Sequence, residues 1–152
     1  MSVKRKRSRT GQPRRPLTKA LLLPMDRASA SEQSLRLHLA LVACRECQAN
    51  SHLINELMRA VYLAYFLQRA GYGRHPDEHF KVAECAVEVA LAHAHETGEW
   101  RLTPDVIGDF EELIALYDAQ LAHAPLHAVL HAEGQLRDFL AGMERSPIVV
   151  AE

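Results

Sequence analysis

The stretch between Asn50 and Gly71 constrains the fold most strongly, because a helix wound from it is apolar around most of its circumference. Its apolar residues recur at steps of three and four and then widen almost to a full circle: Ile54, Leu57, Met58, Val61, Tyr65 and Phe66, with Leu53, Tyr62 and Leu67. Such a helix has to be packed on more than one side. Asn50 or Ser51 can cap its start, and Gly71 can take the left-handed turn that ends it.

Amphipathic segments on either side supply the partners that this helix needs. We predict helices at about 32–48, 77–96, 103–121 and 126–144, because apolar residues recur there with helical spacing and Gly or Pro separates most of the segments. In the first of them Ser31 is the expected cap. Its expected inward residues are Leu35, Leu39 and Val42, beside Leu37, Leu41 and Cys44. An alternating run rich in Val, Ile and Thr is absent from the sequence, so the fold class is all-α.

The predicted architecture is a single five-helix bundle. The bundle domain covers residues 20–148, after a basic arm at 1–19 and before a C-terminal tail at 149–152. The arm combines Lys and Arg runs with Gly11, Pro13 and Pro16, so it cannot bury enough apolar area to offset its ordering entropy and is expected to be disordered alone. The last stretch, 147–152, is expected to be frayed.

Charge divides the chain into two unequal parts. Residues 1–19 contain eight cationic side chains and no acidic ones: Lys4, Arg5, Lys6, Arg7, Arg9, Arg14, Arg15 and Lys19. The rest holds ten of the 18 Lys and Arg residues and all 19 Asp and Glu residues, which gives it a formal charge of −9. A basic arm on an acidic body is the chain's most informative global feature.

The basic arm predicts contact with nucleic acid. Each Lys or Arg that neutralises a phosphate releases counterions, so a flexible cationic segment binds backbone without a fixed geometry. Aromatic residues are absent from the arm, which argues against base stacking and leaves DNA and RNA equally open. A solubilising tail and an address signal such as a nuclear import sequence are the alternative interpretations.

A helix-turn-helix over 96–121 is disfavoured. Its recognition helix would carry Asp105, Asp109, Glu111, Glu112 and Asp118, and phosphates lining the major groove would repel that charge. We interpret these five residues as a protein-interaction surface. An acidic surface can also bind a basic partner or mimic DNA, as an inhibitor of nucleic-acid-binding machinery would.

Histidines and cysteines suggest a metal only weakly. His127 and His131 are four residues apart, a spacing that can place two imidazoles on one metal ion. His93, His95 and His123 could add further ligands. The ordinary interpretation of these histidines is that they are exposed or cap helices. Cys44 and Cys47 form a lone CxxC that would need Cys85 or a histidine to complete a zinc site. Gly-rich phosphate loops and GxSxG are missing from the sequence. We expect no enzyme, no cofactor and no metal ligand.

Three cysteines are an odd number, and they fall inside predicted helices, so reduced thiols are expected. The apolar run after the arm is four residues long before Pro24, too short for a secretory signal, and nothing approaches the roughly 20 apolar residues of a membrane span. We expect a cytoplasmic protein that does not contact a membrane.

Short motifs along the chain resemble a group of small helical proteins from proteobacterial genomes, plasmids and phages. They are the basic start at 4–9, LLLPM at 21–25, VYLAYFL at 61–67, LYDAQL at 116–121 and RSPI at 145–148. Some members of the group are labelled Fis-like transcriptional regulators. The resemblance implies a bacterial regulator from a mobile-element setting.

Two main hypotheses follow. The first is a non-enzymatic accessory protein that contacts nucleic-acid backbone through its arm, while the acidic bundle binds another protein or a second copy of itself. The alternative is an acidic interaction module or inhibitor whose body is the active part. A metal- or ligand-binding bundle is the third.

Overall fold

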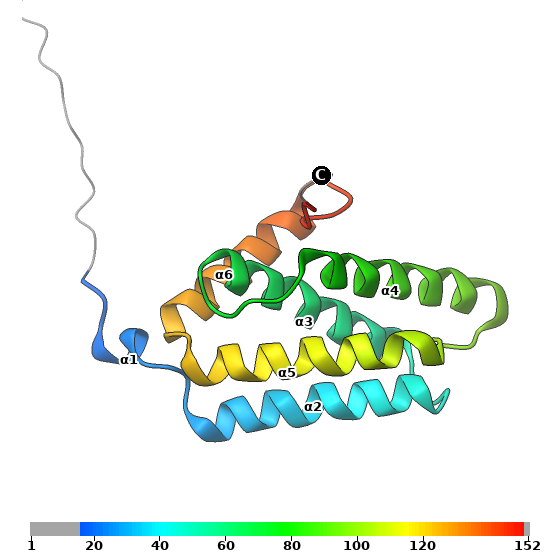
Figure 1. Ribbon diagram of the computed structural model, residues 1–152, viewed down its shortest axis with the longest axis horizontal. Helices are drawn as coiled ribbons and strands as arrows, with labels where there is room; N and C mark the ends of the chain where they lie inside the picture. Colours follow the sequence, from blue (N-terminus) through cyan, green and yellow to red (C-terminus); the bar gives the residue numbers. More distant parts are fainter. Residues whose placement is uncertain (1–15, 151–152) are drawn as a thin grey trace, which may run out of the picture.

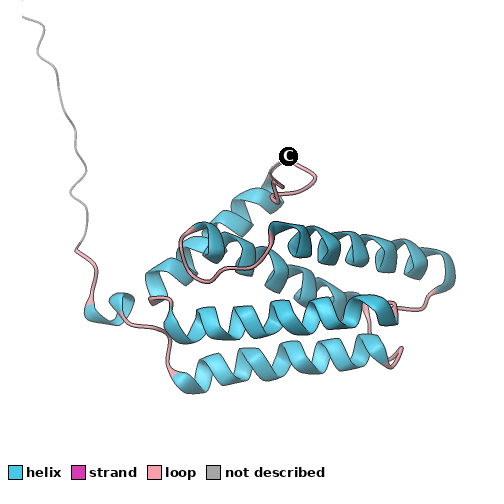
Figure 2. Cartoon of the chain, viewed as in Figure 1, coloured by secondary structure: helices cyan, strands magenta, loops and turns pink. Residues whose placement is uncertain are grey.

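The computed structural model describes residues 16–150, and in this part the chain is helical without strands (Figures 1 and 2). Six α-helices and one 3-10 turn follow in order: α1 (Lys19–Leu22), α2 (Arg27–Arg45), α3 (Ser51–Arg69), α4 (Asp77–Thr97), η1 (Pro104–Val106), α5 (Ile107–His123) and α6 (Leu126–Ala141). The all-α class is confirmed. The predicted count of five helices was one too low, because Lys19, the last residue of the arm, and the three residues after it form the single turn α1.

α3 is the centre of the bundle, as predicted. It packs against α2, α4, α5 and α6 (Figure 1), and ten of its residues are buried. Ile54 and Leu67 are fully enclosed at 0% exposure. Complete burial of such side chains contributes roughly 1.5–3 kcal/mol each relative to exposure. The side chain of Asn50 accepts a hydrogen bond of 3.0 Å from the backbone N–H of Leu53 and so caps the helix.

The start of α2 differs from the sequence prediction. The helix begins at Arg27, and Asp26 caps it by accepting from the backbone N–H of Ser29 at 2.8 Å. Ser31, the expected cap, therefore lies inside the helix. Asp26 is a strong capping residue, and the four small or polar residues that follow it are compatible with a first helical turn.

The inward face of α2 was only half correctly predicted. Leu37, Leu41 and Cys44 are buried between α2 and the rest of the bundle, whereas the other three predicted residues are exposed: Leu35 at 60%, Leu39 at 59% and Val42 at 43%. Positions two residues apart point about 200° apart on a helix of 3.6 residues per turn. α2 packs against α3 and α5, and this contact covers one of its two apolar stripes.

The C-terminal segment after α6 is packed against the bundle and not frayed as far as residue 150. Ile148 is 6% exposed and belongs to the core. The backbone N–H of Val149 donates a hydrogen bond of 3.0 Å to the hydroxyl of Tyr65 on α3. Residues 151–152 lie outside the described part. None of the helices within residues 16–150 combines the length and apolarity needed to cross a bilayer.

Candidate functional site

The loop between α3 and α4 runs directly against α5. Gly73 has a φ of +83°, a left-handed conformation that favours glycine. A Cβ at this position would lie 2.8 Å from the Cδ1 of Leu116 on α5. A side chain here would therefore require Leu116 to shift and would strain the left-handed backbone, so glycine lets the loop lie close against α5.

Two glutamine side chains hold this loop in place. The Oε1 of Gln68 accepts from the backbone N–H of His75 at 2.6 Å, and its Nε2 donates to the His75 carbonyl at 2.8 Å and to Oδ1 of Asp77 at 3.1 Å. Gln120 of α5 is buried, and its Nε2 donates to the carbonyls of Ala64 at 3.0 Å and Tyr72 at 2.8 Å. The backbone around His75 is thus fixed from both α3 and α5.

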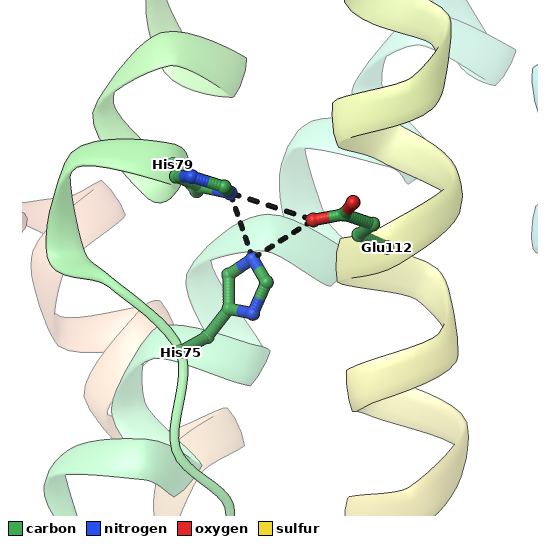
Figure 3. Close-up of side chains that lie close together, drawn as sticks. All are labelled: His75, His79 and Glu112. Atoms are coloured by element: carbon green, nitrogen blue, oxygen red, sulfur yellow. Dashed lines mark hydrogen bonds and ion pairs between the residues drawn. The ribbon is translucent and has the colours of Figure 1, made fainter.

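This loop places His75 opposite His79 and Glu112 (Figure 3). The Nε2 of His75 lies 2.9 Å from the Nδ1 of His79, and both nitrogens lie 3.6 Å from the Oε2 of Glu112. The ring planes meet at 83°, with centroids 4.6 Å apart. The rings therefore do not stack, and their nitrogens point toward one another and toward the carboxylate.

The three side chains differ in exposure, and together they form a half-open cluster. The exposed fraction of the side chain is 18% for His75, 36% for His79 and 61% for Glu112. The edge of the His75 ring packs against Phe80, with centroids 6.2 Å apart and planes at 86°. Imidazole and carboxylate are ligands for zinc and related ions. Among residues 16–150 this is the one group of three such side chains whose ligand atoms all lie within 4.8 Å of one another.

The predicted nucleic-acid-binding residues fall almost entirely outside the described part. Lys4, Arg5, Lys6, Arg7, Arg9, Arg14 and Arg15 belong to residues 1–15. Lys19 is the first residue of α1 and is exposed.

The five acidic residues predicted to bind a protein do not share one environment. Glu112 is directed to the two histidines, and Asp118 accepts from the hydroxyl of Ser34 at 2.9 Å and lies 3.2 Å from the Nε2 of His38. The other three, Asp105, Asp109 and Glu111, lie at η1 and in the first two turns of α5, where Asp105 and Glu111 are exposed and Asp109 is half-buried.

The histidines and cysteines weighed from sequence are not gathered into a three-ligand cluster among the described residues: His93, His95, His123, His127, His131, Cys44, Cys47 and Cys85. The Nδ1 of His123 lies 2.8 Å from the carbonyl of Ala119, one turn earlier. Cys44 is buried, and burial raises the pKa of its thiol to about 11. Cys47 and Cys85 are exposed.

Sequence reasoning missed His75 and His79. They are four residues apart at the start of α4, the same spacing as His127 and His131, so the signal was present. Nothing local indicates that Glu112, on α5, completes the cluster.

An open apolar groove lies along α4, beside η1 and the C-terminal segment. Its volume is about 680 Å³, and its lining includes Val82, Cys85, Val89, Val106 and Val150.

Comparison of the chain with protein families, curated proteins and solved structures found no match. Function therefore has to be inferred from the residues and their geometry.

Proposed function

We propose that this chain is a non-enzymatic accessory or regulatory protein that contacts nucleic-acid backbone through residues 1–19. Its helical body would serve as a surface for a protein partner or a second copy. The division of charge carries the proposal: eight cations and no acid in the first 19 residues, against a formal −9 in the remainder. Polyanions are attracted to one of these parts and repelled by the other.

The arrangement of the helices supports this separation. α1 contacts α6, and the backbone N–H of Leu126 donates to the carbonyl of Leu23 at 2.8 Å. Lys19, at the start of α1, therefore lies near the junction of α5 and α6, whereas Asp105, Asp109 and Glu111 lie at or near the start of α5 (Figure 1). A helix of 17 residues is about 25 Å long, so these carboxylates are far from Lys19 and do not neutralise it.

The acidic residues of α5 also make it unsuited to reading a base sequence in the major groove. They therefore favour contact between the arm and the phosphate backbone. A recognition helix inserts its N-terminal residues into the major groove, which is lined by phosphates, and the first turn of α5 carries the acidic Asp109. The setting proposed with this function is the bacterial cytoplasm and a mobile genetic element.

A second candidate is an acidic interaction module or inhibitor. Asp105 and Glu111 are exposed at one end of the body, where they are accessible to a basic protein. This candidate does not require the arm, and it predicts that the body alone retains the activity.

Gel shifts with and without residues 1–19 separate the two candidates. The full chain should bind duplex or single-stranded nucleic acid at low salt, and the variant lacking residues 1–19 should not. A full-length variant with all eight arm cations changed to Gln should behave like the truncated one.

The matched control changes cations of the body, Arg27, Arg36 and Arg45, to Gln. All three are exposed on α2, and Arg36 and Arg45 already pair with Glu32 and Glu46 at 3.0 and 2.9 Å. This control should bind nearly as well as the wild type. Retained binding after removal of the arm would reject the proposal. If the full chain bound no nucleic acid at all, that would also reject it and would favour the acidic module.

A further inference from the structure

We propose that His75, His79 and Glu112 form a binding site for one divalent transition-metal ion, with zinc as the best match. The site is separate from the arm and does not depend on the proposed function. It links the start of α4 to α5 through three side chains. A fourth position would be left open to water, because Glu112 is largely exposed.

The spacing of the three ligand atoms fits a tetrahedral ion. Zinc binds imidazole nitrogen and carboxylate oxygen at about 2.0–2.2 Å, and tetrahedral geometry then separates neighbouring ligand atoms by about 3.3–3.5 Å. The observed separations are 2.9 Å between the two nitrogens and 3.6 Å from each nitrogen to the oxygen. Shifts of a few tenths of an ångström would seat the ion at the centre.

Hydrogen bonding alone explains the arrangement poorly. The two nitrogens share one hydrogen bond, in which one ring donates and the other accepts. The Oε2 of Glu112 faces both nitrogens at 3.6 Å, which is too long for a hydrogen bond to either. Two ring nitrogens and one carboxylate oxygen thus converge on one point. Once the proton shared by the two rings is displaced, a cation there would bind all three atoms.

The surroundings hold the ligands in place before an ion arrives. Gln68 fixes both backbone polar groups of His75, and Phe80 packs against its ring. Gly73 allows the loop to approach α5. Metal sites depend on such supporting contacts, because they orient the ligands and reduce the cost of ordering them.

The donor types select the class of ion. Calcium and magnesium prefer sites made of oxygen atoms, whereas two imidazoles and one carboxylate suit zinc, cobalt, nickel, copper and iron. Zinc accepts three protein ligands and one water without a change in geometry. The site is therefore expected to discriminate strongly against magnesium.

The test is a titration of the full, untagged chain with zinc chloride after treatment with a chelator. A competing zinc indicator reports binding, and the expected stoichiometry is one ion per chain. His79→Gln and Glu112→Gln should each weaken binding by at least about 10-fold, since each removes one of three ligands. Magnesium chloride at the same concentration should not compete.

The matched control is the double variant His127→Gln and His131→Gln, which removes an equally spaced pair from α6. It should bind zinc like the wild type. Thermal unfolding followed by circular dichroism checks that each variant is folded. It also gives a second readout, because zinc should raise the Tm of the wild type and the control more than that of Glu112→Gln.

Any of three results would overturn the proposal. One is the absence of saturable zinc binding by the wild type. The second is zinc binding that Glu112→Gln and His79→Gln leave unchanged while both variants are folded. The third is zinc binding that the double His127 and His131 variant abolishes.

Discussion

The hydroxyl of Tyr62 on α3 donates a hydrogen bond of 2.8 Å to the Glu84 carboxylate on α4, inside the bundle. Glu84 is 1% exposed, so its charge needs partners in the interior. Lys81 donates to the second carboxylate oxygen, and its Nζ also lies 3.1 Å from the hydroxyl of Ser146. One buried carboxylate therefore joins α3, α4 and the C-terminal segment.

Replacing Tyr62 by Phe should destabilise the protein. The change leaves one buried oxygen of Glu84 without its partner, which costs about 1–3 kcal/mol in the free energy of unfolding. Urea unfolding measures the difference. Tyr72→Phe is the control, since Tyr72 is half-buried and its hydroxyl makes no hydrogen bond within residues 16–150. An equal loss in both variants would contradict the role given to the Tyr62 hydroxyl.

The Lys81–Glu84 pair should weaken in alkali. The hydrogen bond that Lys81 donates to Glu84 raises the pKa of Lys81 above its usual 10.5. A folded-state pKa raised in this way contributes stability that is complete below pH 10.5 and is lost as the pH rises through the folded value.

The measurement compares unfolding free energies of the wild type and Lys81→Met between pH 8 and 12. The advantage of the wild type should be constant at the lower end and shrink above about pH 10.5. The comparison cancels most of the tyrosine ionisation common to both proteins. An advantage that grows with pH would contradict the pairing.

The three thiols should divide into two reactive ones and one protected one. Cys44 is completely buried, and the pKa of its thiol is raised to about 11, whereas Cys47 and Cys85 are exposed. Ellman's reagent should titrate two thiols in the native protein and the third only after unfolding. The Cys44→Ala variant should show the same number of reactive thiols before and after unfolding. Three fast thiols in the native wild type would contradict the burial of Cys44.

The cap of α3 should contribute measurably to stability. Asn50→Ala removes the acceptor for the backbone N–H of Leu53 and should lower the free energy of unfolding by about 0.5–2 kcal/mol. Asn50→Asp keeps an acceptor oxygen and should lose much less. Equal losses in the two variants, measured by urea unfolding, would show that the cap is not responsible.

The helical class and the position of α3 could be predicted because they depend on local periodicity. The apolar residues of α3 cover most of its circumference, which indicates a helix at the centre of the bundle. α2 has two apolar stripes, and which of them is covered depends on where α3 and α5 lie. The sequence alone does not show which stripe is covered, so Leu35 and Leu39 were predicted to be buried although the structure leaves them exposed. Burial of Ile148 also depends on a tertiary contact.

The candidate metal site could be predicted only in part, for a similar reason. The spacing of His75 and His79 is visible in the sequence, but Glu112 comes from another helix. Its approach depends on Gly73 and on hydrogen bonds of Gln68 and Gln120 to distant backbone groups. The charge division, in contrast, follows directly from the sequence.

The salt dependence of nucleic-acid binding tests the central claim most directly. If all eight arm cations contact phosphates of duplex DNA, log K should fall against log salt with a slope of up to about −7. Changing those eight residues to Gln should bring the slope close to zero. Fluorescence anisotropy with a labelled duplex, measured across a series of salt concentrations, gives both slopes. A steep slope for the wild type that disappears in the variant is the predicted result, and a slope and affinity unaffected by the substitutions would contradict the account.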